Sequence, residues 1–163
     1  MVWMNFQLIK GREKMLLALE RMDFGDEADL DITGENYRML INACFDYAPF
    51  FSFTIFEADI PELRPYIWRV QVEEDCFKPG KHYKTVYYHC CQGSKDYLCQ
   101  TPHSLFYWKG SWLTPENLCF YRADGSILLR SIAHDQDCYV YLQGEDINKF
   151  LPIAPWRIAE IEK

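Results

Sequence analysis

The fold is decided within residues 37–56, YRMLINACFDYAPFFSFTIF, where the spacing of the apolar residues changes. Before Pro49 they fall three or four residues apart, which predicts an amphipathic helix packed on one side. They are Tyr37, Leu40, Ile41, Cys44, Phe45 and Ala48. Pro49 ends this helix. From Phe50 to Phe56 the chain is aromatic and β-branched with apolar residues on both faces, which predicts a central, doubly covered strand.

Similar spacing predicts elements on both sides of this stretch. Lys10–Met22 carries Met15, Leu16, Leu19 and Met22 at helical intervals, so we expect an earlier helix. Tyr66–Glu73 alternates, which predicts a strand with Trp68, Val70 and Val72 on a buried face. Further strands are expected at Tyr83–Cys90, Tyr97–Cys99, Leu105–Trp108, Leu118–Arg122, Ile127–Ile132 and Cys138–Leu142. Pro155 suits the first turn of a short closing helix with Trp156, Ile158 and Ile161.

These elements predict an α+β fold. Two N-terminal helices would pack on one face of a largely antiparallel sheet of about six or seven strands, with a short C-terminal helix. The 163 residues contain no linker or internal repeat, so we expect a single domain spanning residues 1–163.

The composition limits the class of protein. A net charge of -7 and a pI near 5.1 argue against a nucleic acid partner, which requires a clustered positive face. The longest apolar runs are too short to cross a bilayer, so no membrane association is expected. The chain has an odd number of cysteines, seven, and its opening residues do not resemble an export signal. We therefore expect free thiols and a cytoplasmic location.

Residues 89–99, HCCQGSKDYLC, gather potential zinc ligands, but their spacing disfavours a metal. No CxxC pair is present, and Cys90 and Cys91 would point to opposite faces of a strand. The loop Gln92–Lys95 would close a hairpin that sets Cys90 and Cys99 diagonally apart, too far for an unstrained disulfide. We expect no metal and no cofactor. His103 could join Cys99, and a Cys-His nucleophile pair remains conceivable in chemical terms, but no orienting third group is evident.

Two other clusters contain acids that could serve chemistry. Asp29-Leu-Asp-Ile-Thr-Gly34 partly matches a calcium loop and a DxDxT phosphatase nucleophile, but the first lacks its final Glu and the second its preceding strand. The simpler interpretation is a helix N-terminus capped by Asp31 or Thr33. His134-Asp-Gln-Asp137 joins a base with acids, although a polar turn is expected between the strands on either side.

An acidic segment and an aromatic segment suggest contact with a partner. Residues 23–35 hold six acids and no base, and concentrated charge attracts and selects a basic partner. Residues 106–112 are rich in the aromatic types that dominate interfaces. The candidate partner-binding residues are Asp23, Asp26, Glu27, Asp29, Asp31, Glu35, Tyr107, Trp108 and Trp112.

These patterns favour a small acidic protein-binding domain that captures a basic protein, in the manner of an inhibitor or immunity protein. No convergent catalytic set is apparent, so the sequence favours a binding protein over an enzyme. Two alternatives remain open: a small-molecule-binding protein or enzyme with an aromatic- and Cys-lined pocket between helices and sheet, and a homo-oligomer whose aromatic residues bury one another.

Overall fold

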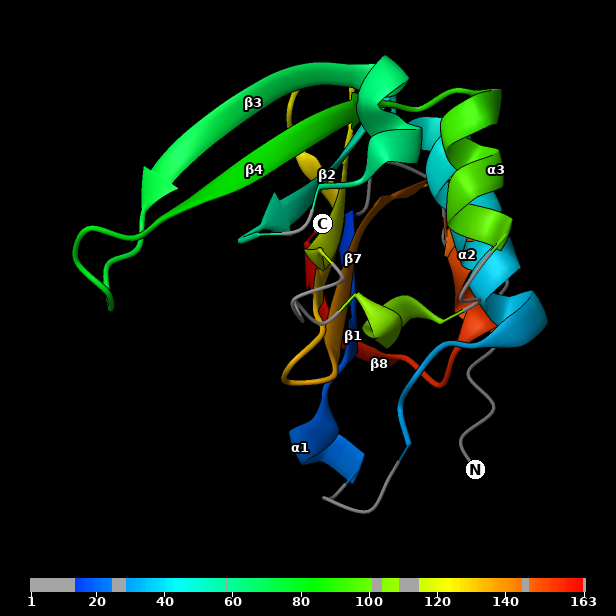
Figure 1. The fold of residues 1–163 in the computed structure, drawn as a ribbon. Coiled ribbons are helices and arrows are strands. Elements are labelled where there is room, and N and C mark those ends of the chain that lie inside the picture. Colours follow the sequence, from blue (N-terminus) through cyan, green and yellow to red (C-terminus); the bar gives the residue numbers. More distant parts are fainter. Residues whose placement is uncertain are drawn as a thin grey trace.

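The fold is organised around one antiparallel sheet (Figure 1). The structure, a computed structural model, describes residues 14–24, 29–57, 59–100, 104–108, 115–144 and 147–162. Its eight strands lie in the order β3-β4-β2-β5-β6-β7-β1-β8. They are β1 (Lys14–Leu19), β2 (Phe50–Ile55), β3 (Ile67–Glu74), β4 (His82–His89), β5 (Glu116–Tyr121), β6 (Ile127–Ile132), β7 (Asp137–Gln143) and β8 (Arg157–Glu162).

Helices cover one face of this sheet (Figure 1). The longest described helix, α2 (Gly34–Tyr47), sends Phe45 against Phe51 of β2 and Phe120 of β5. Helix α3 (Gln92–Gln100) packs beside α2. The short elements are α1 (Arg21–Phe24), α4 (Ile147–Phe150) and the 3₁₀ helices η2 (Pro61–Tyr66), η3 (Leu105–Tyr107) and η5 (Leu151–Ile153). The core lies between α2 and the sheet, where Phe51 and Phe53 are fully buried.

The predicted arrangement of two N-terminal helices, six or seven strands and a C-terminal helix is wrong. The fold is α+β, but the first described element is strand β1, and the first long helix among the described residues begins at Gly34. The expected helix at Lys10–Met22 is β1 from Lys14 onward, followed by the single turn α1. Residues 10–13 lie outside the described residues. The closing helix after Pro155 is strand β8.

Both errors have one physical cause, which is pairing between the ends of the chain. β1 lies between β7 and β8, and Leu16 and Ala18 on its second face are also apolar, so its sequence KMLLAL lacks the alternation of a one-sided strand. Met15, Leu17 and Leu19 share one face of the strand, whereas Met15, Leu16, Leu19 and Met22 fit helical spacing, so the sequence fits both patterns. The β8 strand pairs with β1, far away in sequence, which local spacing does not reveal.

The predicted hairpin at Tyr83–Cys99 is also wrong in its second half, because Tyr97–Cys99 belong to helix α3. The Ser94 hydroxyl accepts a hydrogen bond from the Cys91 amide at 3.0 Å and donates to the His89 carbonyl at 2.7 Å, which turns the chain out of β4. The segment proposed for Leu105–Trp108 begins with a 3₁₀ turn instead of a strand.

Several predictions are confirmed. Helix α2 ends at Tyr47, before Pro49, and β2 follows at once between β4 and β5. The β5–β6 hairpin turns at Asp124-Gly125, where Gly125 has the positive φ of 85° that this turn requires, and β7 completes the meander. All seven cysteines are free.

The β3–β4 hairpin extends past the rest of the sheet, away from α2 and α3 (Figure 1). Strand β3 was predicted correctly, but its expected buried face is wrong. Trp68, Val70 and Val72 are 49%, 48% and 60% exposed. The irregularity between Ile67 and Arg69 turns Trp68 to the face opposite α2, where it stacks on Phe50. Val70 and Val72 stay on the α2 side, but no described helix reaches far enough to cover them.

Candidate functional site

The strand register brings aromatic side chains together on the sheet face opposite α2. Because Phe51 contacts α2, its neighbour Phe50 points to the other face. Phe50 is paired directly with Tyr121 of β5 and with His89 of β4. In the next row, Tyr87 of β4 lies opposite Ser52 of β2 and Arg69 of β3. Residues from four adjacent strands thus meet on one surface.

We call these residues the aromatic patch: Phe50, Trp68, Tyr87, His89 and Tyr121. Trp68 stacks on Phe50 with centroids 4.1 Å apart and planes inclined by 19°. Tyr87 meets Trp68 edge-on at 6.2 Å and Tyr121 at 5.5 Å, and His89 lies 5.4 Å from Phe50. Trp68 and His89 are exposed, and the other rings are half-buried. The patch is therefore ordered by mutual packing but still open to solvent at Trp68.

Polar groups contact two of the patch rings, Tyr121 and Tyr87. Ser52 and Tyr121 share a hydrogen bond of 2.9 Å between their hydroxyl groups, and burial raises the pKa of Tyr121, which keeps its hydroxyl protonated at neutral pH. The Arg69 guanidinium lies 5.5 Å from the centroid of the Tyr87 ring. This is cation–π geometry, so the patch already holds one guanidinium of its own chain.

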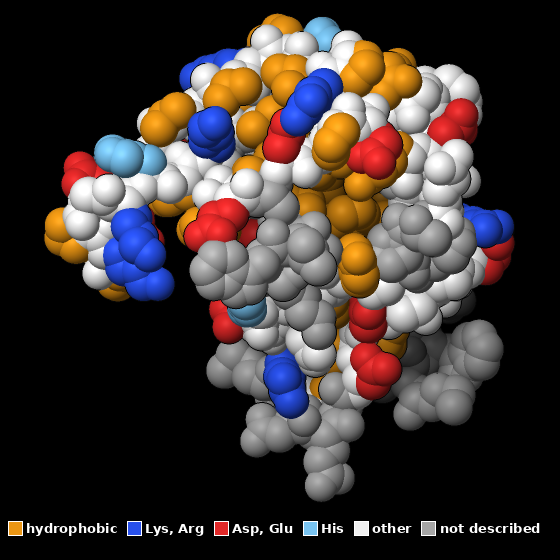
Figure 2. Space-filling view, viewed as in Figure 1, with side chains coloured by type: hydrophobic (Ala, Val, Ile, Leu, Met, Phe, Trp, Pro, Cys, Tyr) orange, Lys and Arg blue, Asp and Glu red, His pale blue; other side chains and the backbone are white. Residues whose placement is uncertain are grey.

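The opposite side of the β3–β4 hairpin is also apolar and uncovered. Val70 and Val72 are 48% and 60% exposed on this side. On the patch side of the same hairpin, Phe56 is 50% exposed and its ring lies 5.6 Å from that of Tyr83, which is paired with Glu73. Phe77 in the hairpin turn is 90% exposed. Figure 2 shows hydrophobic side chains distributed along this hairpin and over the surface beside it, interspersed with charged residues.

The structure separates the acids that were predicted as partner contacts. The Asp23 carboxylate accepts a hydrogen bond from Arg157 Nε at 2.7 Å, beside the Glu20 carboxylate on the same guanidinium. Asp31 accepts hydrogen bonds from the Ser104 hydroxyl and, at 2.9 Å, from the Phe106 amide. Asp29 and Glu35 are exposed. Asp26 and Glu27 lie outside the described residues.

Asp31 therefore has a structural task. It ties residues 104–106 to the start of α2, together with the Leu105 amide that donates to the Ile32 carbonyl at 3.0 Å. The expected helix N-terminus is present and begins after Thr33, but neither Asp31 nor Thr33 makes the expected side-chain cap. Asp29 instead accepts from the Asp31 amide at 3.1 Å in a local turn.

The predicted aromatic contacts also divide. Tyr107 is 45% exposed, whereas Trp108 is 2% exposed and packs 4.8 Å from Phe53 in the core. The Trp108 indole N–H approaches the Tyr37 hydroxyl at 3.4 Å, which fixes it in place. Trp112 lies outside the described residues.

The His and Cys residues of the segment 89–99 do not converge. Cys91 is exposed, while Cys90 and Cys99 are half-buried against the core. Burial raises the pKa of the Cys90 thiol to about 12, so it stays protonated and is a poor nucleophile. Within the described part of the chain, no group of three or more His, Cys, Asp or Glu residues is arranged to hold a metal ion. His103 lies outside that part.

His134, in the turn between β6 and β7, meets an acid from β5. Its Nε2 lies 2.8 Å from Glu116 Oε1, and the Glu116 side chain is only 11% exposed. Burial raises the pKa of Glu116, and His134 opposes this shift. Asp137, from the same predicted cluster, instead accepts from the Arg21 amide at 3.1 Å. His134 of the predicted cluster therefore forms a pair with Glu116, which lies outside that cluster. Among the described residues, no Ser or Cys side chain is recorded in contact with His134.

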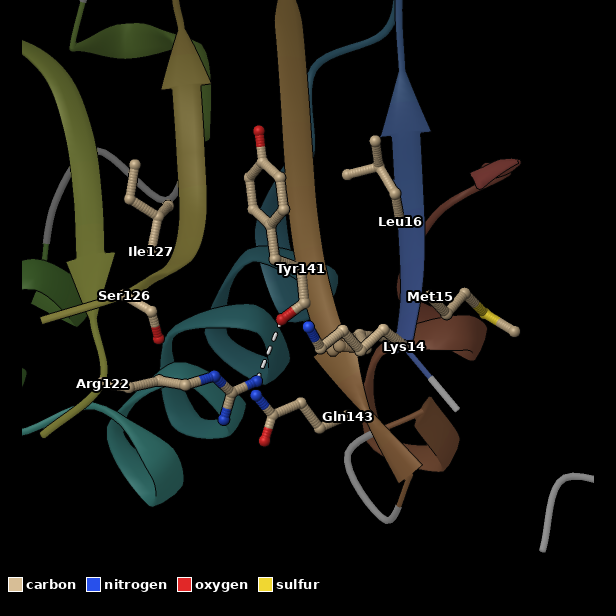
Figure 3. Close-up of a pocket in the computed structure, with 9 residues that line it drawn as sticks. Lys14, Met15, Leu16, Arg122, Ser126, Ile127, Tyr141 and Gln143 are labelled. Carbon is tan, nitrogen blue, oxygen red and sulfur yellow. Dashed lines mark hydrogen bonds between the residues drawn. The ribbon is translucent and has the colours of Figure 1, made fainter. Parts of the chain in front are cut away.

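A cavity of about 480 Å³ opens on the sheet where β1, β7 and the β5–β6 hairpin meet (Figure 3). Leu16, Ile127 and the Tyr141 ring line its apolar side. Lys14 and Arg122 lie at its other end, where Arg122 donates to the Tyr141 carbonyl at 2.9 Å. This cavity is not the expected aromatic- and Cys-lined pocket between helices and sheet, because aromatic core residues such as Phe51 and Tyr88 fill that space.

Comparisons with protein-family models, curated proteins and solved structures find no match to this chain. None of the helices in the described ranges is long and apolar enough to cross a membrane. The site must therefore be judged from its own geometry, and among the described residues the aromatic patch joins five rings on a surface that is open to solvent at Trp68 and His89.

Sequence reasoning missed the aromatic patch. The signal was the presence of apolar residues on both faces of Phe50–Phe56, which we attributed to double coverage. Only the pairing of β2 with β4 and β5 shows that Phe50 meets His89 and Tyr121 on the face opposite α2.

Proposed function

We propose that this chain is a protein-binding domain that captures a basic protein through the aromatic patch. The observation that supports this most strongly is the stacked pair Phe50–Trp68, in which Trp68 is held at 4.1 Å and yet remains 49% exposed. Tryptophan and tyrosine dominate the binding energy of interfaces because a rigid ring buries much area at a small entropic cost.

The charge distribution supports a basic partner. The patch holds Arg69 of its own chain over Tyr87, and an arginine or lysine of a partner would gain the same cation–π attraction over Trp68, within about 6 Å of its ring. The net charge of -7 would draw a positively charged protein toward the surface. We include the exposed residues Asp29, Glu35 and Tyr107 as secondary contacts, and retain Asp26, Glu27 and Trp112 as candidates from the sequence. A cytoplasmic location agrees with seven free thiols.

Affinity capture with paired variants tests this proposal. Native chain, Trp68→Ala and Phe77→Ala serve as baits in lysate of the source cells, at low salt and at about 0.5 M salt. Phe77→Ala is the matched control, because Phe77 is 90% exposed but lies outside the patch. We expect a basic protein to bind the native bait and Phe77→Ala, to bind Trp68→Ala at least about tenfold less, and to weaken at high salt. Equal recovery on Trp68→Ala would refute the proposal.

A small-molecule role is a second candidate, supported by the cavity at Arg122. An apolar wall of Leu16 and Ile127 facing the cations Lys14 and Arg122 suits a carboxylate with a short hydrocarbon body. Calorimetry with decanoate and decanol would test it. Binding of decanoate that Arg122→Gln abolishes would support this role, and equal affinity for decanol would exclude it.

A further inference from the structure

Strand β3 forms one edge of the sheet. Within the described ranges it pairs only with β4, so one row of its backbone groups has no strand beside it. Natural edge strands are usually short, irregular or interrupted by proline, which prevents association with other chains. β3 is eight residues long, and after one irregularity between Ile67 and Arg69 its pairing with β4 is regular from Val70 to Glu74.

The side chains of this strand are complementary to themselves. We propose that β3 pairs with β3 of a second copy of the chain, antiparallel, about a two-fold axis at Gln71. In that register Arg69 lies opposite the partner's Glu73, and Val70 lies opposite the partner's Val72. Because the contact is symmetric, each of these pairs occurs twice and Gln71 meets its own copy.

The alternation of faces selects this register over its neighbours. Residues directly opposite in an antiparallel pair share a face, so the register changes in steps of two residues. A shift that centres the axis on Val70 places Arg69 opposite the partner's Gln71, and Glu73 then has no positively charged residue opposite it. A shift that centres the axis on Val72 places Val70 opposite the partner's Glu74, which pairs an apolar side chain with a charged one. Only the register centred on Gln71 matches every charge with an opposite charge and every valine with a valine from Arg69 to Glu73.

Both faces of the hairpin fit this arrangement. On one face Arg69 donates to the Gln71 amide oxygen at 3.3 Å, and Gln71 donates to Glu73 Oε1 at 2.9 Å, which forms a polar row that an antiparallel copy would extend. On the other face Val70 and Val72 are 48% and 60% exposed, and pairing would cover them. Five paired residues bury less surface than a standard stable interface, so the dimer is a weak one with a micromolar dissociation constant on the order of 10–100 µM.

Charge exchange tests the register. Sedimentation of the purified chain from about 1 to 500 µM would compare native protein with Arg69→Glu, Glu73→Arg and the double exchange Arg69→Glu/Glu73→Arg. Each single reversal places like charges opposite each other twice, so we expect its dissociation constant to rise at least about tenfold. The double exchange restores opposite charges and should return the constant to within about threefold of native.

Two controls keep the result interpretable. Lys78→Glu makes the same change in net charge as Arg69→Glu but lies in the hairpin turn, outside the paired residues, so its dimer should be unchanged. Amide hydrogen exchange of concentrated native chain should show protection of β3 that is lost on dilution. The same measurement on the single variants should show native protection outside β3, which verifies that they remain folded.

Three outcomes would overturn the proposal. If the native chain is monomeric at all concentrations tested, β3 does not pair with a second copy, and its edge could pair only with a different protein. A dimer that tolerates both single reversals would lie on another surface. A double exchange that fails to dimerise would exclude this register. The inference does not rest on the proposed function, because it is measured on purified chain and all its variants retain Trp68.

Discussion

Strands β2 and β3 of the same sheet both carry apolar side chains on the face toward α2, but these side chains are buried in β2 and exposed in β3. In β2, Phe51 and Phe53 are fully buried beneath α2, whereas in β3 Val70 and Val72 are 48% and 60% exposed on the same side of the sheet. The difference lies in what covers the strand. Alternation determines which side chains share a face, but burial depends on how far α2 and α3 reach across it. The uncovered β3–β4 hairpin is therefore available for contact with other molecules.

Truncation on the two strands should produce the largest contrast. We expect Phe51→Ala to lower the free energy of unfolding by about 3–5 kcal/mol, because it leaves a cavity under α2. Val72→Ala, its counterpart on the hairpin, should cost no more than about 0.5 kcal/mol. Urea unfolding of both variants checks this, and similar losses would show that the hairpin is covered after all.

Helix α3 packs closely against the Tyr66 side chain at Gly93. A Cβ atom there would overlap the hydroxyl and ring of Tyr66, so Gly93→Ala should destabilise the chain by about 1–3 kcal/mol. In a Tyr66→Ala background the obstacle is gone, and the same change should be neutral or stabilising by up to about 1 kcal/mol, because alanine favours helix. Thermal melts of the four proteins would contradict this if Gly93→Ala cost the same in both backgrounds.

A buried hydroxyl supports the end of α3. The Tyr37 hydroxyl donates to the Leu98 carbonyl at 2.8 Å, and this carbonyl is among the last four of the helix, which have no partner within it. Tyr37→Phe should therefore cost about 1–2 kcal/mol. Amide exchange should rise in α3 more than in β6. A variant as stable as native would mean that water replaces the hydroxyl.

The smallest expected effect concerns pH at Glu116. Burial raises the pKa of this carboxyl group above its ordinary value of 4.5, so over the pH range just above 4.5 the unfolded chain loses the proton before the folded chain does. The contribution of Glu116 to stability therefore falls as the pH rises through that window. Urea unfolding at several pH values should show Glu116→Gln gaining stability relative to native above pH 4.5. A difference in unfolding free energy between Glu116→Gln and native protein that does not change with pH would contradict this.

The sequence predicted the parts of the fold that depend on local spacing. The spacing of apolar residues and Pro49 predicted helix α2 and the strand β2 that follows it. The turn residues Asp124-Gly125 predicted the β5–β6 hairpin. The sequence failed at β1 and β8, whose identity depends on pairing between the two ends of the chain, and at α3, which starts where Ser94 binds the carbonyl of His89. The aromatic patch could not be predicted, because Phe50, Trp68 and Tyr121 become neighbours only through the strand order.

Amide hydrogen exchange on dilute, monomeric chain tests most directly whether the sheet has a covered and an uncovered region. We predict that the amides of β2 and β5 exchange only through global unfolding, with rates that depend steeply on urea. The amides of β3 should exchange much faster by local opening, with little dependence on urea. Protection of β3 equal to that of β2 in the dilute chain would contradict the account.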